Sequence, residues 1–407
     1  MRIFEGYTWI QKVVLIIWLL MVLTIPFHKV LSSPLLILSF IIILFSGNYR
    51  SRWMYFTTHK RWMIFAALYL LVGYAYLRST DKQEALRDAN VKLYLLLIPV
   101  FMAAFGQVTQ KAIQTFLNAF VFACAAFGVV ALGLALYDFI RTGENHFYYK
   151  YLVDFTFIHP SYIAMFMVFA MIVIAREIIT GYRELSSRRI WVMLIAIAFF
   201  MLFVLLLTAK IAIASMFLAL TIAFIVWGRT YLGWKRTAFI AVIGNLVLFL
   251  AMMALPYTRQ RMLMLLHYNE VSYTNSVDSR EEIWKAVGQV ADDHLWLGVG
   301  SGDAQQVLIN QYAENGFTTG VEERYNAHNA YFQALVETGL PGMLFFLGFF
   351  LVCLWLAWKD KNYLWGAFLL LFMVNITTES MLKTQSGVVF FSFFNALLGL
   401  NSSRKRG

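Results

Sequence analysis

The amino-acid sequence predicts an all-α, polytopic membrane protein with about twelve transmembrane helices and one large external loop that contains short helices. Hydrophobic residues make up 61% of the 407 positions, charged residues only 14%, and the mean hydropathy is +0.68. Soluble domains are about half apolar and about a quarter charged, so this chain is too apolar to be one of them. Its apolar residues also form stretches of about 20, the length that crosses a hydrocarbon core of about 30 Å.

The apolar stretches divide the chain into three regions. We expect an N-terminal transmembrane region at 1–256, an external loop at 257–341 and a C-terminal transmembrane region at 342–407. No small-residue cleavage site follows the first stretch, so we interpret it as a retained span. The candidate spans are residues 13–31, 33–48, 62–78, 91–106, 112–140, 160–175, 190–208, 211–228, 237–256, 342–358, 363–379 and 386–400.

The basic residues predict the orientation of these spans. If the C-terminal Arg404-Lys405-Arg406 lies in the cytoplasm, most of the other basic residues also fall in short cytoplasmic segments. That distribution is typical of membrane proteins with both ends inside. The net charge of +11 is therefore explained by topology and by contact with anionic lipid head groups, and no nucleic-acid partner is expected.

The segment 257–341 differs from every other connection. It carries half of the acidic residues of the chain and lies on the external side of the predicted membrane. Loops of this length inside a compact protein are usually functional. The two cysteines, Cys124 and Cys353, fall in predicted spans, so we expect no disulfide in the loop.

Arg280 is the first candidate site residue in this loop. Ser279 and Glu282 have the spacing of a capping box, and apolar residues including Trp284 then recur at helical spacing, which predicts a helix of about 12 residues that starts at Arg280. The unpaired N–H groups of a first helical turn favour an anion, and a guanidinium there would add phosphate binding. The alternative is a solvated surface arginine.

His328 is the second candidate. A helix is predicted from about Ala327 to Thr338, with Gly339 and Pro341 as its stop signal. In such a helix His328 shares a face with Tyr331, whereas Glu337 points to the opposite side and would not orient the imidazole. A lone histidine on an aromatic face can also be a packing residue.

Lys210 is the third candidate. Residues 190–228 are almost continuously apolar, and they form two spans only if the chain turns near Lys210. The turn places an ammonium group at the external edge of the membrane. Such a residue is by default a functional hypothesis, although snorkelling to the interface is the structural alternative.

Two other polar groups favour simpler interpretations. Asp292, Asp293 and His294 follow one another on a helix, where successive side chains diverge by about 100°, so we interpret them as a solvated helix end and expect no metal site. Lys92 stands near Asp88 and further residues of both signs around the predicted external connection between the third and fourth spans. Its cation could contact acceptor phosphates, but the adjacent acids indicate a mixed, solvated surface.

A set of motifs between about residues 190 and 345 resembles the O-antigen ligase and polymerase superfamily. Where the family usually has an arginine, this chain has Lys210, which keeps the charge but not bidentate phosphate recognition. The motifs are Ala209-Lys210-Ile211 at the turn of a span pair, Ser279-Arg280 with Trp284, the glycine-rich Gly298-Val-Gly-Ser-Gly302, and His328-Asn329 with Glu337, Gly339 and Gly342.

The resemblance implies a GT-C-like membrane glycosyltransferase of the bacterial inner membrane whose catalytic loop faces the periplasm. The donor would be a glycan on undecaprenyl pyrophosphate and the acceptor a sugar hydroxyl of the lipid A core. Arg280 and Lys210 would bind the pyrophosphate, and His328 would activate the acceptor in an inverting, metal-independent reaction without a cofactor. The supporting residues would be Asn329, Tyr331, Glu337 and Trp284.

Two alternatives stay open at this point. An O-antigen polymerase or a protein O-oligosaccharyltransferase would use the same donor with another acceptor. A transporter of lipid-linked glycan should have broken helices in paired halves near the bilayer midplane. The six prolines show no such pairing, which favours an enzyme.

Overall fold

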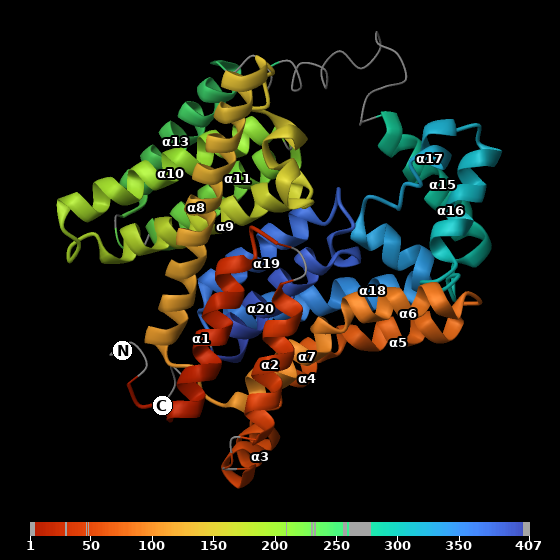
Figure 1. The fold of residues 1–407 in the computed structure, drawn as a ribbon, viewed down its shortest axis with the longest axis horizontal. Coiled ribbons are helices and arrows are strands. Elements are labelled where there is room, and N and C mark those ends of the chain that lie inside the picture. Colours follow the sequence, from red (N-terminus) through yellow and green to blue (C-terminus); the bar gives the residue numbers. More distant parts are fainter. Residues whose placement is uncertain are drawn as a thin grey trace. The chain divides into compact units, whose positions relative to one another are not determined.

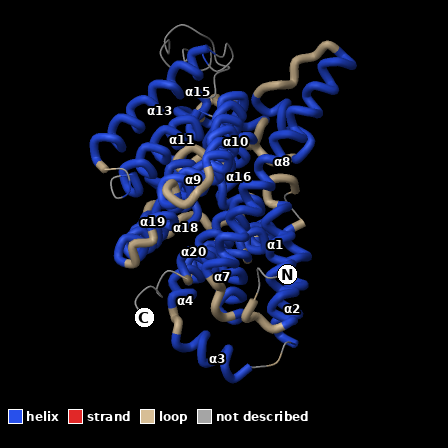
Figure 2. The backbone as a smooth tube through the Cα atoms, turned by 90° about the vertical axis from the view of Figure 1, so that its left-hand side faces the viewer, coloured by secondary structure: helices blue, strands red, loops and turns tan. Residues whose placement is uncertain are grey.

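The computed structural model describes residues 5–28, 31–45, 47, 49–208, 210–228, 231, 233–254, 259 and 278–401. These residues form helices and connecting segments, and no strand occurs among them (Figure 2). The predicted all-α class is therefore confirmed for this part of the chain. Of the predicted external loop, all residues before Asp278 except 259 lie outside the described residues.

Seven helices in the described part are long and apolar enough to cross a membrane, which confirms a polytopic protein. They are Lys82–Phe105 (α6, Lys82–Lys92, with α7, Tyr94–Phe105), α8 (Gln110–Thr142), α9 (Pro160–Gly181), α10 (Ser187–Leu207), Ile211–Gly228 (most of α11, Lys210–Ala223, with η3, Phe224–Gly228), α13 (Trp234–Ala254) and α18 (Ala330–Lys359). Shorter apolar helices are α1 (Trp9–Thr24), α2 (Ser32–Phe45), α19 (Tyr363–Asn375) and α20 (Gln385–Leu400). The total of twelve spans and the three-part division of the chain stay predictions.

The chain folds into two compact units, each built from separate stretches of sequence. Unit 1 contains residues 1–47, 107–266 and 361–375. Its central helix is α9, which packs against α8, α10, α11 and α19. Every residue from Pro160 to Ala175 is buried, because these four helices surround α9.

The predicted turn between two spans lies in unit 1. Helix α10 ends at Leu207, Thr208 has a left-handed backbone with φ of 49°, and α11 begins at Lys210. The N–H of Thr208 donates to the carbonyl of Leu205 and closes the last turn of α10. The hydropathy argument for a turn at this point is therefore confirmed, and Lys210 lies in a first helical turn.

Unit 2 contains residues 48–106, 267–360 and 376–407. In it α5 (Leu68–Arg78) packs against α6 and α18, and the three helices lie side by side in Figure 1. Helix α7 packs against α3 (Tyr49–Thr58), α4 (Arg61–Ala66) and α20. An ion pair of 2.6 Å joins Arg61 to Asp360, just after α18. This scaffold supports the segments at both ends of α18.

Three helices of the predicted external loop precede α18 in unit 2: α15 (Asp278–His294), α16 (Ala304–Glu314) and α17 (Thr318–Glu322). Ile283 and Val287 of α15 pack with Leu308 and Tyr312 of α16 in a buried apolar cluster. The predicted helix is thus present, but it is 17 residues long and begins at Asp278 rather than at Arg280. Ser279 is consequently inside the helix and is not its N-cap.

Helix α18 is broken at Gly339, where the sequence predicts a stop. Gly339 has φ of 71° and ψ of −177°, and Pro341, just beyond it, has no N–H to offer to the carbonyl of Glu337. That carbonyl instead accepts from Gly300, at 3.0 Å, and the carbonyl of Val336 accepts from Val299, at 2.9 Å. The glycine-rich turn therefore supplies the hydrogen-bond donors for the two carbonyls at the break of the helix.

The glycines of this turn are required by close backbone approach rather than by a ligand. A Cβ at Gly298 would lie 2.5 Å from the backbone nitrogen of Thr338, and one at Gly302 would lie 2.1 Å from the carbonyl of Asp81. No side chain fits at such distances. The turn thus packs directly against α18 and against the connection between α5 and α6.

Replacing Gly339 by alanine should destabilise the protein by about 1–3 kcal/mol, because its backbone conformation is almost restricted to glycine. A Cβ there would also lie 2.6 Å from the carbonyl carbon of Trp296. Gly348 is the matched control in the same helix, because a Cβ at Gly348 would meet nothing within 4 Å. Thermal unfolding in detergent should show a loss for Gly339→Ala only, and equal midpoints for the two variants would contradict this account.

Candidate functional site

His328 lies in a loop and not, as the sequence predicts, on a helix. Helix α18 begins at Ala330, and Asn329 is its N-cap, with an extended backbone and a side chain that accepts from the N–H groups of Tyr331 and Phe332. His328 itself has a φ of 43°. The prediction of a helix over 327–338 was wrong at its start because an asparagine cap, and not the apolar spacing, sets the first residue.

The imidazole of His328 is paired with a carboxylate that the sequence analysis did not select. Its Nδ1 lies 3.4 Å from Oε1 of Glu379, and their side chains are 25% and 10% exposed, respectively. Glu379 belongs to the segment between α19 and the short 3-10 helix η4 (Met381–Lys383). An acidic residue at the end of the predicted span 363–379 could have been found by the reasoning that selected Lys210, since ionisable residues at span ends are rare.

The loop that carries His328 is held from several sides. Trp284 of α15 donates from Nε1 to the carbonyl of Ala327 at 3.2 Å. Asn326 accepts from the N–H of His328 at 2.8 Å, and the ring of Tyr325 stands edge-on to the imidazole at 5.3 Å. These contacts confine the backbone on both sides of the imidazole. Trp284 therefore contacts the loop that carries His328, and its role as a supporting residue stays a prediction.

Arg280 lies near the same carboxylate. It is in the first turn of α15, as predicted, and its Nη2 donates to the carbonyl of Thr378 at 3.1 Å. Thr378 is the residue before Glu379. The segment around residue 378 therefore brings Arg280, Glu379 and His328 together, and the interpretation of Arg280 as a purely solvated residue is not supported.

The predicted site residues Lys210, Tyr331 and Asn329 have different positions and contacts. Lys210 begins α11 in unit 1, and its side chain is outside the described residues. Tyr331 packs edge-on against Phe346, with the ring centres 5.5 Å apart, so it joins the two halves of α18. Asn329 is 7% exposed and acts as the helix cap.

Glu337 does not contact His328, in agreement with the predicted direction of its side chain, but belongs to a buried ring of four charges. The Nζ atom of Lys92 lies 2.7 Å from Asp88 and 3.0 Å from Glu337. The Nζ atom of Lys383 lies 2.8 Å from Asp88 and 3.1 Å from Glu337. Asp88, Lys92 and Glu337 are all less than 10% exposed, so the predicted solvated surface around Asp88 and Lys92 was wrong.

The lysines of this charge ring are already neutralised. Burial disfavours the charged form of Lys383, but the carboxylates of Glu337 and Asp88 outweigh that effect and raise the pKa of Lys383 above its usual value. Two ammonium groups and two carboxylates leave no net charge. The ring is therefore unsuited to binding a phosphate, and its chemistry is that of a structural anchor.

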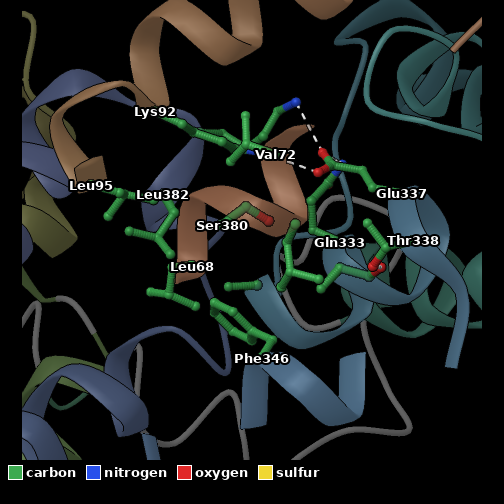
Figure 3. A pocket seen from close by; sticks show the side chains of 14 residues that line it. Leu68, Val72, Lys92, Leu95, Gln333, Glu337, Thr338, Phe346, Ser380 and Leu382 are labelled. Carbon is green, nitrogen blue, oxygen red and sulfur yellow. Dashed lines mark hydrogen bonds and ion pairs between the residues drawn. The ribbon is translucent and has the colours of Figure 1, made fainter. Parts of the chain in front are cut away.

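A mostly apolar cavity of about 60 Å³ lies beside the ring (Figure 3). Lys92, Gln333 and Glu337 form its polar end, and its other walls include Leu68, Leu95 and Phe346. The hydroxyl of Ser380 also lines it and is buried, with no hydrogen-bond partner among the described residues.

No group of three or more histidine, cysteine, aspartate or glutamate side chains in the described part of the chain is placed to hold a metal ion. Asp292, Asp293 and His294, which lie at the end of α15, do not form such a group. The chemistry that the described side chains can supply around residue 328 is that of an imidazole, a carboxylate and a guanidinium.

Comparison with known proteins finds a family match over part of the chain. Residues 196–347 match the family model described as O-antigen ligase. The match includes Lys210, Arg280, His328 and Glu337, and it ends before Glu379. No curated protein matches the chain. The family match supports a membrane enzyme of the ligase or polymerase type that acts in lipopolysaccharide synthesis.

Proposed function

We propose that the protein transfers a glycan from undecaprenyl pyrophosphate to a sugar hydroxyl of the lipid A core, and the match of residues 196–347 to the O-antigen ligase family model supports this proposal. The reaction takes place on the periplasmic face of the bacterial inner membrane. The observation that carries this proposal is the pair of His328 and Glu379 at 3.4 Å, with Arg280 bound to the adjacent residue.

The pair of His328 and Glu379 removes the proton of the acceptor hydroxyl. With Nδ1–H directed at the carboxylate of Glu379, the neutral imidazole keeps Nε2 as an acceptor. Nε2 takes the proton of the acceptor hydroxyl while that oxygen forms a bond to the anomeric carbon. The bond between this carbon and the pyrophosphate oxygen breaks, and its electron pair leaves with the pyrophosphate. A single displacement of this kind inverts the anomeric centre.

Arg280 and Lys210 stabilise the departing pyrophosphate, which is the second requirement of the reaction. Arg280 combines a guanidinium with the first turn of α15, where backbone N–H groups favour anions. We assign Lys210 to the same role on the strength of the family motif that it occupies. Because the side chains of Arg280 and Lys210 stabilise the negative charge of the pyrophosphate, the proposed reaction needs no metal ion.

Two related functions use the same donor with a growing glycan or a protein as the acceptor. Deletion of the gene distinguishes them through the lipid-linked product that accumulates. A ligase leaves long, unligated glycan on the lipid, whereas a polymerase leaves single repeat units. A protein O-oligosaccharyltransferase leaves the lipopolysaccharide intact. Accumulation of single repeat units would therefore indicate that the acceptor is a growing glycan and not the lipid A core.

His328→Ala should lower the transfer rate by about 10²- to 10⁴-fold, the usual contribution of a general base, while donor binding persists. The purified variant should be assayed beside the wild type with and without a chelator such as EDTA. The wild type should stay active in EDTA. Near-normal transfer by His328→Ala, or loss of wild-type activity that added divalent metal restores, would reject the mechanism.

For Glu379, substitution by glutamine should reduce kcat by about 10²- to 10⁴-fold, because an amide NH₂ turned to Nδ1 holds the tautomer with the proton on Nε2. The KM for the donor should change little. Glu322→Gln serves as the control, since Glu322 is an exposed acid at the end of α17. Equal kcat values in the two variants would mean that Glu379 does not act through His328.

Substitution of Arg280 by alanine should cost about 2–5 kcal/mol in kcat/KM, the range for truncating one partner of a close charge pair. Lys285→Ala in the same helix is the matched control, because Lys285 is exposed. Lys210→Arg should keep substantial activity, since the charge is preserved. Full activity of Arg280→Ala at normal abundance would remove this residue from the pyrophosphate site.

A further inference from the structure

Gln333 connects the loop of His328 to the buried charge ring. It lies in the first half of α18 and is 5% exposed. Its Oε1 accepts from the backbone N–H of Ala327 at 3.2 Å, and its Nε2 donates to Oε1 of Glu337 at 2.8 Å. Ala327 is the residue immediately before His328. One side chain therefore joins the backbone next to the imidazole to a carboxylate of the ring.

The chemistry of its two partners sets the orientation of this amide. A backbone N–H can only donate, and the carboxylate of Glu337, held by two ammonium groups, can only accept. A carboxamide satisfies both at once. A carboxylate at position 333 would face that of Glu337, and an apolar side chain would leave both partners without this contact.

The charge ring also holds in place the segment that carries Glu379, the partner of His328. Lys383, which pairs with Glu337 and Asp88, closes the segment that begins at Ile376 and carries Glu379. At the start of that segment the carbonyl of Ile376 accepts from the N–H of Ala330 at 2.8 Å. The ring is thus linked to the loop of His328 through Gln333 and to the segment of Glu379 through Lys383.

We propose that Gln333 is a positioning residue for the catalytic histidine: anchored by Glu337, it holds the backbone of Ala327 so that the imidazole of His328 stays in register with Glu379. This inference rests on the proposed role of His328 as the base. A displacement of about 1 Å in a catalytic group can cost about 10²-fold in rate, so the loss of this contact should be visible in kcat.

Two variants of nearly equal size test the proposal. Gln333→Met removes both hydrogen bonds, and Gln333→Glu keeps the acceptor but loses the donor. Both should lower kcat by about 10- to 100-fold near pH 7.5 and leave the KM for the donor within about twofold of the wild-type value. Gln306→Met is the control, because Gln306 is exposed on α16.

The pH dependence separates positioning from a general loss of packing. The charged groups around position 333 are Glu337 on the same helix, Asp88 and Lys92 on α6, and Lys383. As the pH falls, a protonated glutamic acid at 333 regains a donor for Glu337 and an acceptor for Ala327. The ratio of the kcat of Gln333→Glu to that of the wild type should therefore rise at low pH, and the ratio for Gln333→Met should stay constant.

Hydrogen exchange of the wild-type protein tests the contact without relying on a variant that could fail to fold. The amide of Ala327 should be protected, and exchange at the rate of an unstructured amide would overturn the proposal. Wild-type kcat in Gln333→Met, or a ratio for Gln333→Glu that does not change with pH, would also overturn it. An active His328→Ala would reject the proposed role of His328 as the base, and a purified wild type without any glycan transfer would reject the proposed function, so these failures can be told apart from a failure of the role of Gln333.

Discussion

Glu337 makes contacts in three directions, and the arrangement of unit 2 around the candidate site depends on them. Its carboxylate receives two lysines and the amide of Gln333, and its backbone carbonyl receives the N–H of Gly300. Through these contacts the residue ties together α6, α18, η4 and the glycine-rich turn. Removing one partner of a buried ionic group typically costs about 3–5 kcal/mol, because the remaining charge is left uncompensated. Such a residue holds its surroundings in one arrangement.

The break of α18 follows from the same constraint. A continuous helix would keep the carbonyls of Val336 and Glu337 for its own backbone, and the glycine-rich turn would have nothing to bind. Gly339 and Pro341 release these carbonyls, and the N–H groups of Val299 and Gly300 take them. Thus the backbone polarity that a broken helix exposes is satisfied by a neighbouring turn, as an apolar environment requires. The motif of glycines and Glu337 is one structural unit.

Local patterns in the sequence predicted the features that depend on local physics. The length of apolar runs placed the turn before Lys210, and helical spacing placed Arg280 in a first turn. The start of α18 was missed because the cap at Asn329 and the bond from Ala330 to Ile376 decide it, and apolar spacing records neither. Glu379 and the partners of Lys92 were missed for a different reason. The span-end position of Glu379 was a signal that could have been used, but its pairing with His328 and the pairing of Lys92 with Glu337 join residues far apart in the chain, and a single sequence has no signal for such pairs.

The partners of a cation decide whether it can act on a phosphate. By charge alone, Lys92 and Lys383 would be candidates, because both lie close to the segment that carries Glu379. Their pairing with Asp88 and Glu337 removes them, since each ammonium group already contacts two carboxylates. The contact of Arg280 is of another kind, because its Nη2 donates to the backbone carbonyl of Thr378, the residue before Glu379. The structure therefore separates Lys92 and Lys383, whose carboxylate partners hold the buried ring together, from Arg280, which contacts the segment that carries Glu379, the partner of His328.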